Sequence, residues 1–332
     1  MADTLRTLLS FAFAVHLFFH LSSKHFCCFF KMVHVQCLDP RDPNNAFMYC
    51  PSFPAAVLFS ALFGLTLITH FIQAIHYRKR FCWVIIMAAF WETAGLILRV
   101  FSVLNPTSTA YGLPSQLLIL LAPLLINAFL YMLMSRVIYV FLPDKHVGGI
   151  SAQRLSLCFV LFDITAFLMQ AGGGTMISSD APKIAVLGIH IYMGGIGLQQ
   201  FFVLGFIGLV VRFHYKMNRL DGSTEWKRPL YTMYASLALI TLRIVFRLIE
   251  FSSGLYSPIT MHEAPFYCLE ATPMFLALLL WNISHPGQVL VGPDSEFPKK
   301  VKKSKKSKGG EKELPEASDS PSLRLVSTPT PF

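Results

Sequence analysis

The chain has 332 residues, of which 54% are hydrophobic and only 14% are charged, whereas a soluble domain has about 25% charged residues. This composition excludes an ordinary soluble protein and indicates a multi-pass membrane protein. The formal net charge is +10, and much of the basic excess lies in one lysine run near the C-terminus.

The N-terminus carries two features ahead of the first long apolar run. Leu8–Leu21 is a short apolar run that resembles the core of a signal peptide. Two interpretations stay open: residues 1–31 are signal-like, or they are an upstream extension of a chain that starts at Met32. Cys37 and Cys50 flank a polar stretch, and a disulfide between them is one alternative if that stretch is extracytoplasmic.

Seven segments are long and apolar enough to cross a bilayer, since a membrane helix needs about 20 apolar residues. They are approximately 55–75, 82–104, 115–141, 155–177, 184–211, 230–251 and 266–284. Lysine and arginine are frequent in the odd-numbered loops and the tail and scarce in the even-numbered loops. The positive-inside rule therefore predicts an all-α, seven-transmembrane-helix bundle with its N-terminus outside and its C-terminus in the cytoplasm.

This pattern divides the chain into three parts. We expect an N-terminal extracytoplasmic segment at 1–48, a membrane domain at 49–287 and a basic cytoplasmic tail at 288–332. The tail is polar and rich in Pro, Ser, Lys and Glu, which is typical of disorder. Seven lysines between Lys299 and Lys308 either bind anionic lipid head groups or form a solvated run that enforces topology, and the two interpretations are compatible.

Ionisable side chains inside the apolar spans are the strongest sign of function. Each charge at the centre of a membrane helix costs about 2.5–3.5 kcal/mol unless it is paired or hydrated. We therefore expect these residues to face a bundle interior or a water-filled cavity, and the balance of four against four suggests mutual pairing. They are Glu92, Asp163, Glu250, Glu270, Arg99, Arg136, Arg243 and Arg247.

Within single spans, the polar residues repeat at helical spacing, so each span gathers them on one face. The sets are Glu92 with Arg99, Asn127 with Tyr131, Asp163 with Gln170, and Arg243 with Arg247 and Glu250. One interpretation is structural, with buried ion pairs and hydrogen bonds that fix helix register. The other is a path that binds protons or the head group of a substrate.

Glycine and glutamine mark spans four and five. Gly172, Gly173 and Gly174 follow Gln170, and further glycines precede Gln199 and Gln200. Such glycines permit either close helix packing or local unwinding beside a binding site. Pro123 and Pro273 lie inside spans three and seven, where each frees backbone carbonyls that need other partners.

Several classes of protein lack their signatures in this sequence. The chain has neither a Gly-rich phosphate loop with Lys-Ser/Thr nor a His-Glu-x-x-His motif, so we expect no ATPase, no metal site, no cofactor and no enzyme. His70 and His190 lie at different depths, which disfavours a zinc hydrolase. Ser135, rather than an acid, precedes Arg136, and span seven has no Asn-Pro-x-x-Tyr, so a conventional G-protein-coupled receptor is also disfavoured.

Short motifs occur in order and in register with the seven spans. They are Tyr49-Cys50-Pro51-Ser52, Glu92-Thr-Ala-Gly95 with Arg99, Leu121-Ala122-Pro123 with Tyr131 and Arg136, Asp163 with Gln170-Ala-Gly-Gly-Gly174, Gln199-Gln200, Arg243-Ile-Val-Phe-Arg247-Leu-Ile-Glu250, Glu270, and His285-Pro286-Gly287. Over about residues 49–287, these motifs resemble the fungal RTA-like lipid-translocating exporter family.

The resemblance implies movement or export of lipid-like amphiphiles, such as sphingoid long-chain bases, or resistance to sterol-like or azole compounds. It places the protein in the plasma membrane or in internal membranes, with membrane lipids and an amphiphile as partners and no nucleic acid. A long-chain base is a cation with an apolar tail, so Glu92, Asp163, Glu250 and Glu270 are candidate partners for its head group. The alternative is a seven-span receptor or regulator that senses lipids or stress and acts through partner proteins.

Overall fold

The computed structural model describes residues 35, 37, 47–177, 179, 181–220, 225–254, 257 and 259–290. Within them, seven helices are long and apolar enough to cross a membrane, which confirms the predicted all-α polytopic fold. The signal-like segment 1–31 and the lysine run Lys299–Lys308 lie outside the described residues.

The seven spans are continuous helices with short connections. They are α2 (Phe53–Tyr77), α3 (Trp83–Leu104) after the 3-10 turn η1 (Arg80–Cys82), α4 (Thr109–Phe141), α5 (Ala152–Ile177), α6 (Pro182–Leu220), α7 (Lys227–Ser252) and α8 (Thr272–Ile283), which lies between the π-helical turn η2 (Phe266–Ala271) and the 3-10 turn η3 (Pro286–Gln288). A small antiparallel hairpin, β1 (His146–Val147) and β2 (Ile150–Ser151), joins α4 to α5.

The predicted bounds agree within a few residues except at two places. Helix α6 has 39 residues and continues to Leu220, beyond its expected end at residue 211. Helix α4 begins at Thr109 rather than at residue 115. In both cases hydropathy marks where a helix leaves the apolar layer, and hydrogen bonding of the backbone continues past that point.

Local chemistry sets both ends of α2. The Ser52 side chain accepts a hydrogen bond from the backbone N–H of Ala55, and Pro54 occupies the first turn, where its missing N–H costs nothing. At the other end, Arg78 has φ of 51°, in the left-handed region, and its N–H donates to the Ala74 carbonyl. The apolar run between these caps therefore forms a single helix.

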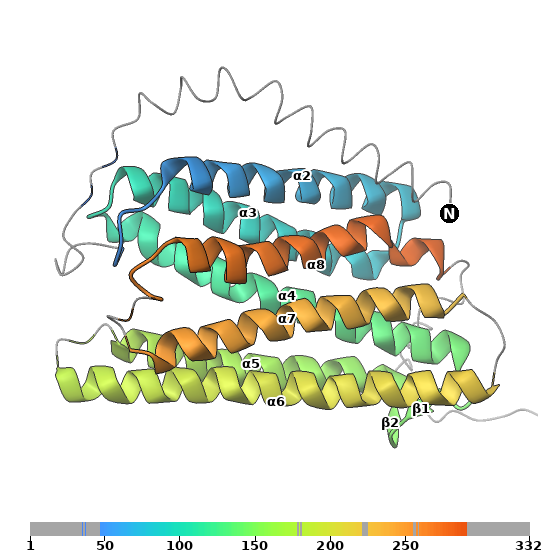
Figure 1. Cartoon of the computed structure of the whole chain (residues 1–332). Helices are drawn as coiled ribbons and strands as arrows, with labels where there is room; N and C mark the ends of the chain where they lie inside the picture. The colour runs from blue at the N-terminus through green and yellow to red at the C-terminus, as the bar shows by residue number, and fades with distance from the viewer. Residues whose placement is uncertain are drawn as a thin grey trace, which may run out of the picture. The chain divides into compact units, whose positions relative to one another are not determined.

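Consecutive helices pack side by side, and α8 packs against α2, so the seven spans close into one bundle (Figure 1). Because the connections are short, neighbouring helices run antiparallel. We call the end that carries Cys37 and Cys50 the disulfide end. The basic end is the opposite one, where Arg78, Lys145 and Arg219 lie.

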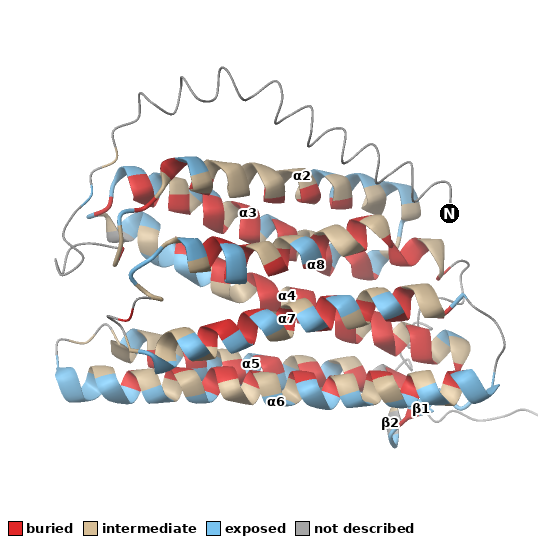
Figure 2. Ribbon diagram, in the orientation of Figure 1, coloured by how far each residue is buried: buried red, intermediate tan, exposed pale blue. Residues whose placement is uncertain are grey.

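Burial differs strongly between the helices (Figure 2). Of the 18 consecutive residues that form the most apolar part of α4, 61% are buried, whereas in the corresponding part of α2 only 22% are buried. The outward residues of α2 include Ile68, Ile72 and Ile75, each more than half exposed. Helix α4 is therefore an inner element, and the exposed apolar face of α2 suits contact with lipid chains.

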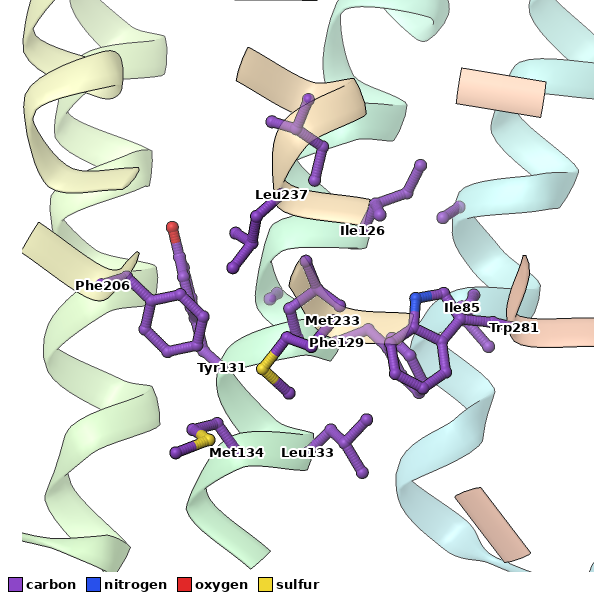
Figure 3. Close-up of a cluster of buried hydrophobic side chains, with 14 of the residues drawn as sticks. Ile85, Ile126, Phe129, Tyr131, Leu133, Met134, Phe206, Met233, Leu237 and Trp281 are labelled. Carbon is purple, nitrogen blue, oxygen red and sulfur yellow. The ribbon is translucent and has the colours of Figure 1, made fainter. Parts of the chain in front are cut away.

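Aromatic side chains fill the interior between α4 and its neighbours (Figure 3). The Phe129 ring meets Trp281 of α8 edge-on at 5.3 Å between centroids, and the Tyr131 ring meets Phe206 of α6 at 4.6 Å. Because lipid chains are as apolar as these side chains, close packing rather than water exclusion holds the helices together here.

Candidate functional site

Two arginines of α7 share one buried carboxylate. Nη2 of Arg243 lies 2.9 Å from Oε1 of Glu270, and Nη1 of Arg247 lies 3.3 Å from its Oε2. The Glu270 side chain is 2% exposed and those of the arginines are 4% and 7% exposed. Glu270 therefore shares its negative charge between two arginines that lie one helical turn apart.

Arg247 has two further partners. Its Nη1 donates to Oε2 of Glu250 at 3.0 Å, and its Nη2 donates to the hydroxyl of Tyr192 on α6 at 2.5 Å. The spacing of seven between Arg243 and Glu250 places them on one face, but the ion pair joins Arg247 and Glu250, three residues apart. Arg247 thus connects α6, α7 and η2.

The turn that carries Glu270 is a π-helix. The Thr272 N–H donates to the carbonyl of Tyr267, five residues earlier, and the Thr272 hydroxyl donates to the same oxygen at 2.7 Å. Pro273 follows at once, where its missing N–H interrupts the regular ladder, as the sequence predicted. Single π turns occur frequently at functional sites, and this one directs Glu270 toward the two arginines.

A second group of contacts surrounds Arg99 at the disulfide end. Its Nη2 donates to the Tyr49 hydroxyl at 2.6 Å and lies 3.5 Å from Oε1 of Glu263. Its Nε donates to the Tyr267 hydroxyl at 3.3 Å. The guanidinium also lies 4.0 Å from the centroid of the Phe266 ring, within the range of a cation–π interaction. Arg99 therefore ties α3 to the segment before α2 and to η2.

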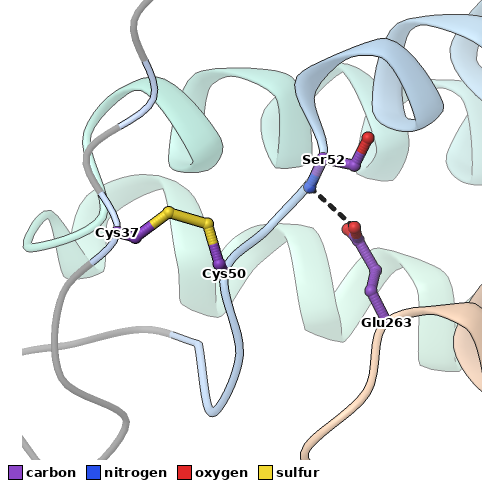
Figure 4. The surroundings of a disulfide bond; sticks show 4 residues. All are labelled: Cys37, Cys50, Ser52 and Glu263. Carbon is purple, nitrogen blue, oxygen red and sulfur yellow. Dashed lines mark hydrogen bonds between the residues drawn. A yellow bond between two sulfur atoms is a disulfide. The ribbon is translucent and has the colours of Figure 1, made fainter.

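Glu263 completes this group from the connection between α7 and η2 (Figure 4). Its Oε2 accepts a hydrogen bond of 2.6 Å from the backbone N–H of Ser52, next to the disulfide between Cys37 and Cys50. The disulfide is the alternative that the sequence left open. Burial raises the pKa of Glu263, while the Ser52 N–H and Arg99 oppose that rise, so its charged form depends on these two donors.

A cavity of about 350 Å³ lies between these two groups. Arg99, Arg247 and Glu250 line it together with the hydroxyl-bearing Ser102 and Ser115. Ser102 is 1% exposed, and its hydroxyl has no hydrogen-bond partner among the described residues. The remaining wall of the cavity includes apolar side chains, among them Phe47, Met48, Leu113 and Phe251. The cavity thus offers two cations, one anion and an unused hydroxyl beside apolar surface.

Other predicted residues form separate polar contacts. Asp163 on α5 accepts hydrogen bonds from Asn127 at 3.0 Å and from the Tyr131 hydroxyl at 2.9 Å, both on α4. Gln170 on α5 donates to Gln199 on α6 at 3.0 Å. All of these residues are buried, and none of them lines the cavity. These hydrogen bonds join α4 to α5 and α5 to α6.

The three consecutive glycines differ in their surroundings. A Cβ on Gly173 would lie 2.5 Å from the backbone nitrogen of Tyr192 on α6, whereas Cβ atoms on Gly172 and Gly174 would meet nothing within 4 Å. Helix α5 continues through all three to Ile177, so close packing at Gly173, and not unwinding, is what the structure shows.

Three more predicted residues, Arg136, Gln200 and Glu92, belong to none of the hydrogen-bonded or ion-paired groups described so far. Arg136 donates to the Met132 carbonyl at 3.1 Å and stacks over Phe81 at 4.2 Å, toward the basic end. Gln200 has a buried side-chain oxygen without a hydrogen-bond partner among the described residues. Glu92 interacts electrostatically with the Arg243–Glu270 pair, but the described part of the chain offers it no ion pair, so the arginines pair with Glu270 instead.

Sequence reasoning missed several residues of the site. Tyr192, Ser102 and Tyr267 carry no signal in a single sequence, because an aromatic or a serine in an apolar span is ordinary. Glu263 carried a signal, since it is an acidic residue in a sixth loop that has no lysine or arginine, and it lies just before a span. Its neighbour in space, Tyr49, belongs to a motif that the resemblance included.

Comparison with known proteins places this chain in a wider group. A family model described as "RTA1 like protein" matches residues 85–292. The chain is 43% identical over 284 residues to the "Probable lipid transporter atnI" of Emericella nidulans, covering 81% of this chain and 74% of that protein. No solved structure matches the chain.

Two yeast proteins are more distant relatives. The "Protoporphyrin uptake protein 1" of Saccharomyces cerevisiae is 32% identical over 198 residues, covering 58% of this chain and 64% of that protein. The "Sphingoid long-chain base transporter RSB1" of the same species is 21% identical over 292 residues, covering 75% of each chain.

Proposed function

Because this chain belongs to the RTA1-like family, we propose that it moves lipid-like amphiphiles across a membrane and that sphingoid long-chain bases are among them. The names of the relatives support transport of lipids or related amphiphiles in general terms. The observation that carries the proposal is the cavity where Arg99, Arg247 and Glu250 meet.

The arginines of the cavity are paired, Arg99 with Glu263 and Arg247 with Glu270, so Glu250 and Ser102 are the groups that suit the head group of a long-chain base. Glu250 would accept the ammonium group, and the hydroxyl of Ser102 would bond to a hydroxyl of the head group. The volume of about 350 Å³ lies at the lower end of ligand pockets, roughly 300–1,000 Å³, so it fits a head group rather than a whole lipid. The acyl chain would remain between helices or in the bilayer.

Several predictions about the setting belong to this proposal. An extracytoplasmic N-terminus agrees with the disulfide between Cys37 and Cys50, because disulfides persist in oxidising compartments. The plasma membrane is the expected location, and export of toxic amphiphiles would confer resistance. Since the sequence lacks an ATP-binding loop, an ion gradient or the substrate gradient would drive movement.

Flux in proteoliposomes tests the proposal. Fluorescent long-chain base, phospholipid and sterol analogues would be followed with wild-type protein, with Glu250→Gln and with the control Glu225→Gln, which alters an exposed acid away from the cavity. We expect protein-dependent flux of the long-chain base that Glu250→Gln abolishes and Glu225→Gln preserves. Absence of flux for every lipid, with demonstrably folded wild type, would refute transport and favour the receptor or regulator.

A further inference from the structure

Around the cavity, the charges of the buried and partly buried side chains do not balance. The described residues there include four carboxylates and three guanidinium groups, namely Glu92, Glu250, Glu263 and Glu270 with Arg99, Arg243 and Arg247. If every group were ionised, this cluster would carry one surplus negative charge. One proton, or one bound cation, would make it neutral.

Glu92 is the carboxylate that the arginines leave without a direct partner. Glu250, Glu263 and Glu270 each lie within 3.5 Å of a guanidinium nitrogen. Glu92 is 2% exposed, its Oε1 has no hydrogen-bond partner, and no ion pair joins it to any residue that the structure describes. An isolated carboxylate in such surroundings is far more costly when charged than when it holds a proton.

The groups that face Glu92 are few. Arg243 from α7 and Glu270 from η2 interact with it, one positive and one negative. Helices α2 and α4, which pack against α3, contribute no described titratable group that interacts with it. The protonation of Glu92 therefore depends on how strongly Glu270 pairs with Arg243.

From this arrangement we propose that Glu92 carries an exchangeable proton, which leaves when a cationic amphiphile binds beside Glu250. The inference rests on the proposed function. An ammonium group at Glu250 would take one partner from Arg247, which would then rely on Glu270. Arg243 would lose part of its hold on Glu270 and pair with ionised Glu92. One cation enters the cluster and one proton leaves it, so the cluster stays neutral.

The exchange makes transport of the cation electroneutral and dependent on a proton gradient. Intramembrane acids act in this way in proton relays of other transporters. With one proton exchanged for each cation, the steady-state ratio of the amphiphile across the membrane would change about tenfold for each pH unit of gradient.

The test uses a fluorescent long-chain ammonium whose quaternary nitrogen is permanently charged, so that it does not redistribute passively with pH. Full-length protein in detergent and weak buffer is titrated with this probe, and proton release is followed with a pH dye. Reconstituted wild type, Glu92→Gln and the control Glu225→Gln are then compared for flux with and without a pH gradient. Because glutamine resembles the protonated acid, Glu92→Gln tests the proton and not the shape.

We expect close to one proton released per bound probe by wild type and by Glu225→Gln, and none by Glu92→Gln. Flux through Glu92→Gln should no longer respond to the pH gradient. Retention of the full response by Glu92→Gln would overturn the inference. Probe binding and flux by wild type without proton release would overturn it as well, while leaving the proposed function intact, and this readout does not require the variant to fold. If folded wild type neither binds nor moves the probe, the proposed function itself fails.

Discussion

Replacing Glu270 with glutamine tests whether this residue holds the bundle together. Arg247 would keep Glu250 and Tyr192 as partners, but Arg243 would keep only the Ile119 carbonyl, at 3.5 Å, as a hydrogen-bond partner among the described residues. Glutamine keeps one acceptor but no charge. The substitution therefore removes the carboxylate in direct contact with the buried Arg243, and Glu92, the other acid that acts on Arg243, forms no ion pair with it in this structure. We expect the substitution to destabilise the folded protein.

The geometry sets the size of this effect. Glu270 is 2% exposed and makes ion pairs of 2.9 Å and 3.3 Å, so it is a fully buried partner. Removing one member of a buried pair costs roughly 3–5 kcal/mol. We expect about 3 kcal/mol for Glu270→Gln, because one of the two arginines keeps another partner. At 2–4 °C per kcal/mol, the midpoint of thermal unfolding would fall by about 10 °C.

Thermal unfolding in detergent, followed by size-exclusion chromatography of heated samples, measures this change. Glu225→Gln is the control, since that side chain is exposed. Adding Arg243→Met to Glu270→Gln removes the orphaned cation and should restore at least half of the lost stability. A Glu270→Gln protein as stable as wild type would refute the reasoning, and so would a double variant no better than the single one.

Three further predictions concern packing, a hydrogen bond and the disulfide. Gly173→Ala should lower the midpoint of thermal unfolding, because its Cβ would lie 2.5 Å from a backbone nitrogen. Gly174→Ala, whose Cβ would meet nothing within 4 Å, should be neutral. Equal midpoints for the two variants would contradict the close packing. Tyr131→Phe removes a donor at 2.9 Å from a buried carboxylate and should cost about 1.5–3 kcal/mol in chemical unfolding, and a smaller cost would mean that another group satisfies that oxygen. Mass spectrometry after maleimide labelling of folded protein should find Cys50 unmodified in wild type and modified in Cys37→Ser; labelling in both would argue against the disulfide.

The sequence predicted the number, order and approximate bounds of the spans because bilayer thickness and hydropathy constrain each helix separately. It also predicted that polar residues gather on one face. It could not predict which residues pair. Glu92 and Arg99 share a face of α3, but seven residues separate them by about 10 Å along the axis. Arg99 consequently meets Tyr49 and Glu263 at the disulfide end, while Glu92 lies deeper, beside the Arg243–Glu270 pair.

Partner choice depends on the rotation and depth of the facing helices, which periodicity within one helix does not encode. The glycine triplet is a second example. Helical spacing cannot say which of the three consecutive glycines faces α6, and only Gly173 does so closely. The π turn is a third, since a proline in a span predicts an interruption but not its form or the direction in which Glu270 then points.

The length of α6 has a mechanical consequence. Lys183 and Arg212 are separated by about 44 Å along the axis, close to the full thickness of a bilayer with its head groups, about 40–45 Å. If these two residues mark the head-group layers, the turns from Phe213 to Leu220 project about 12 Å into water without a break in the helix. A tilt of about 10° around the bilayer midplane would move Leu220 sideways by about 6 Å. Because α6 continues unbroken past Arg212, a small change in its angle within the membrane would displace its C-terminal end outside the membrane.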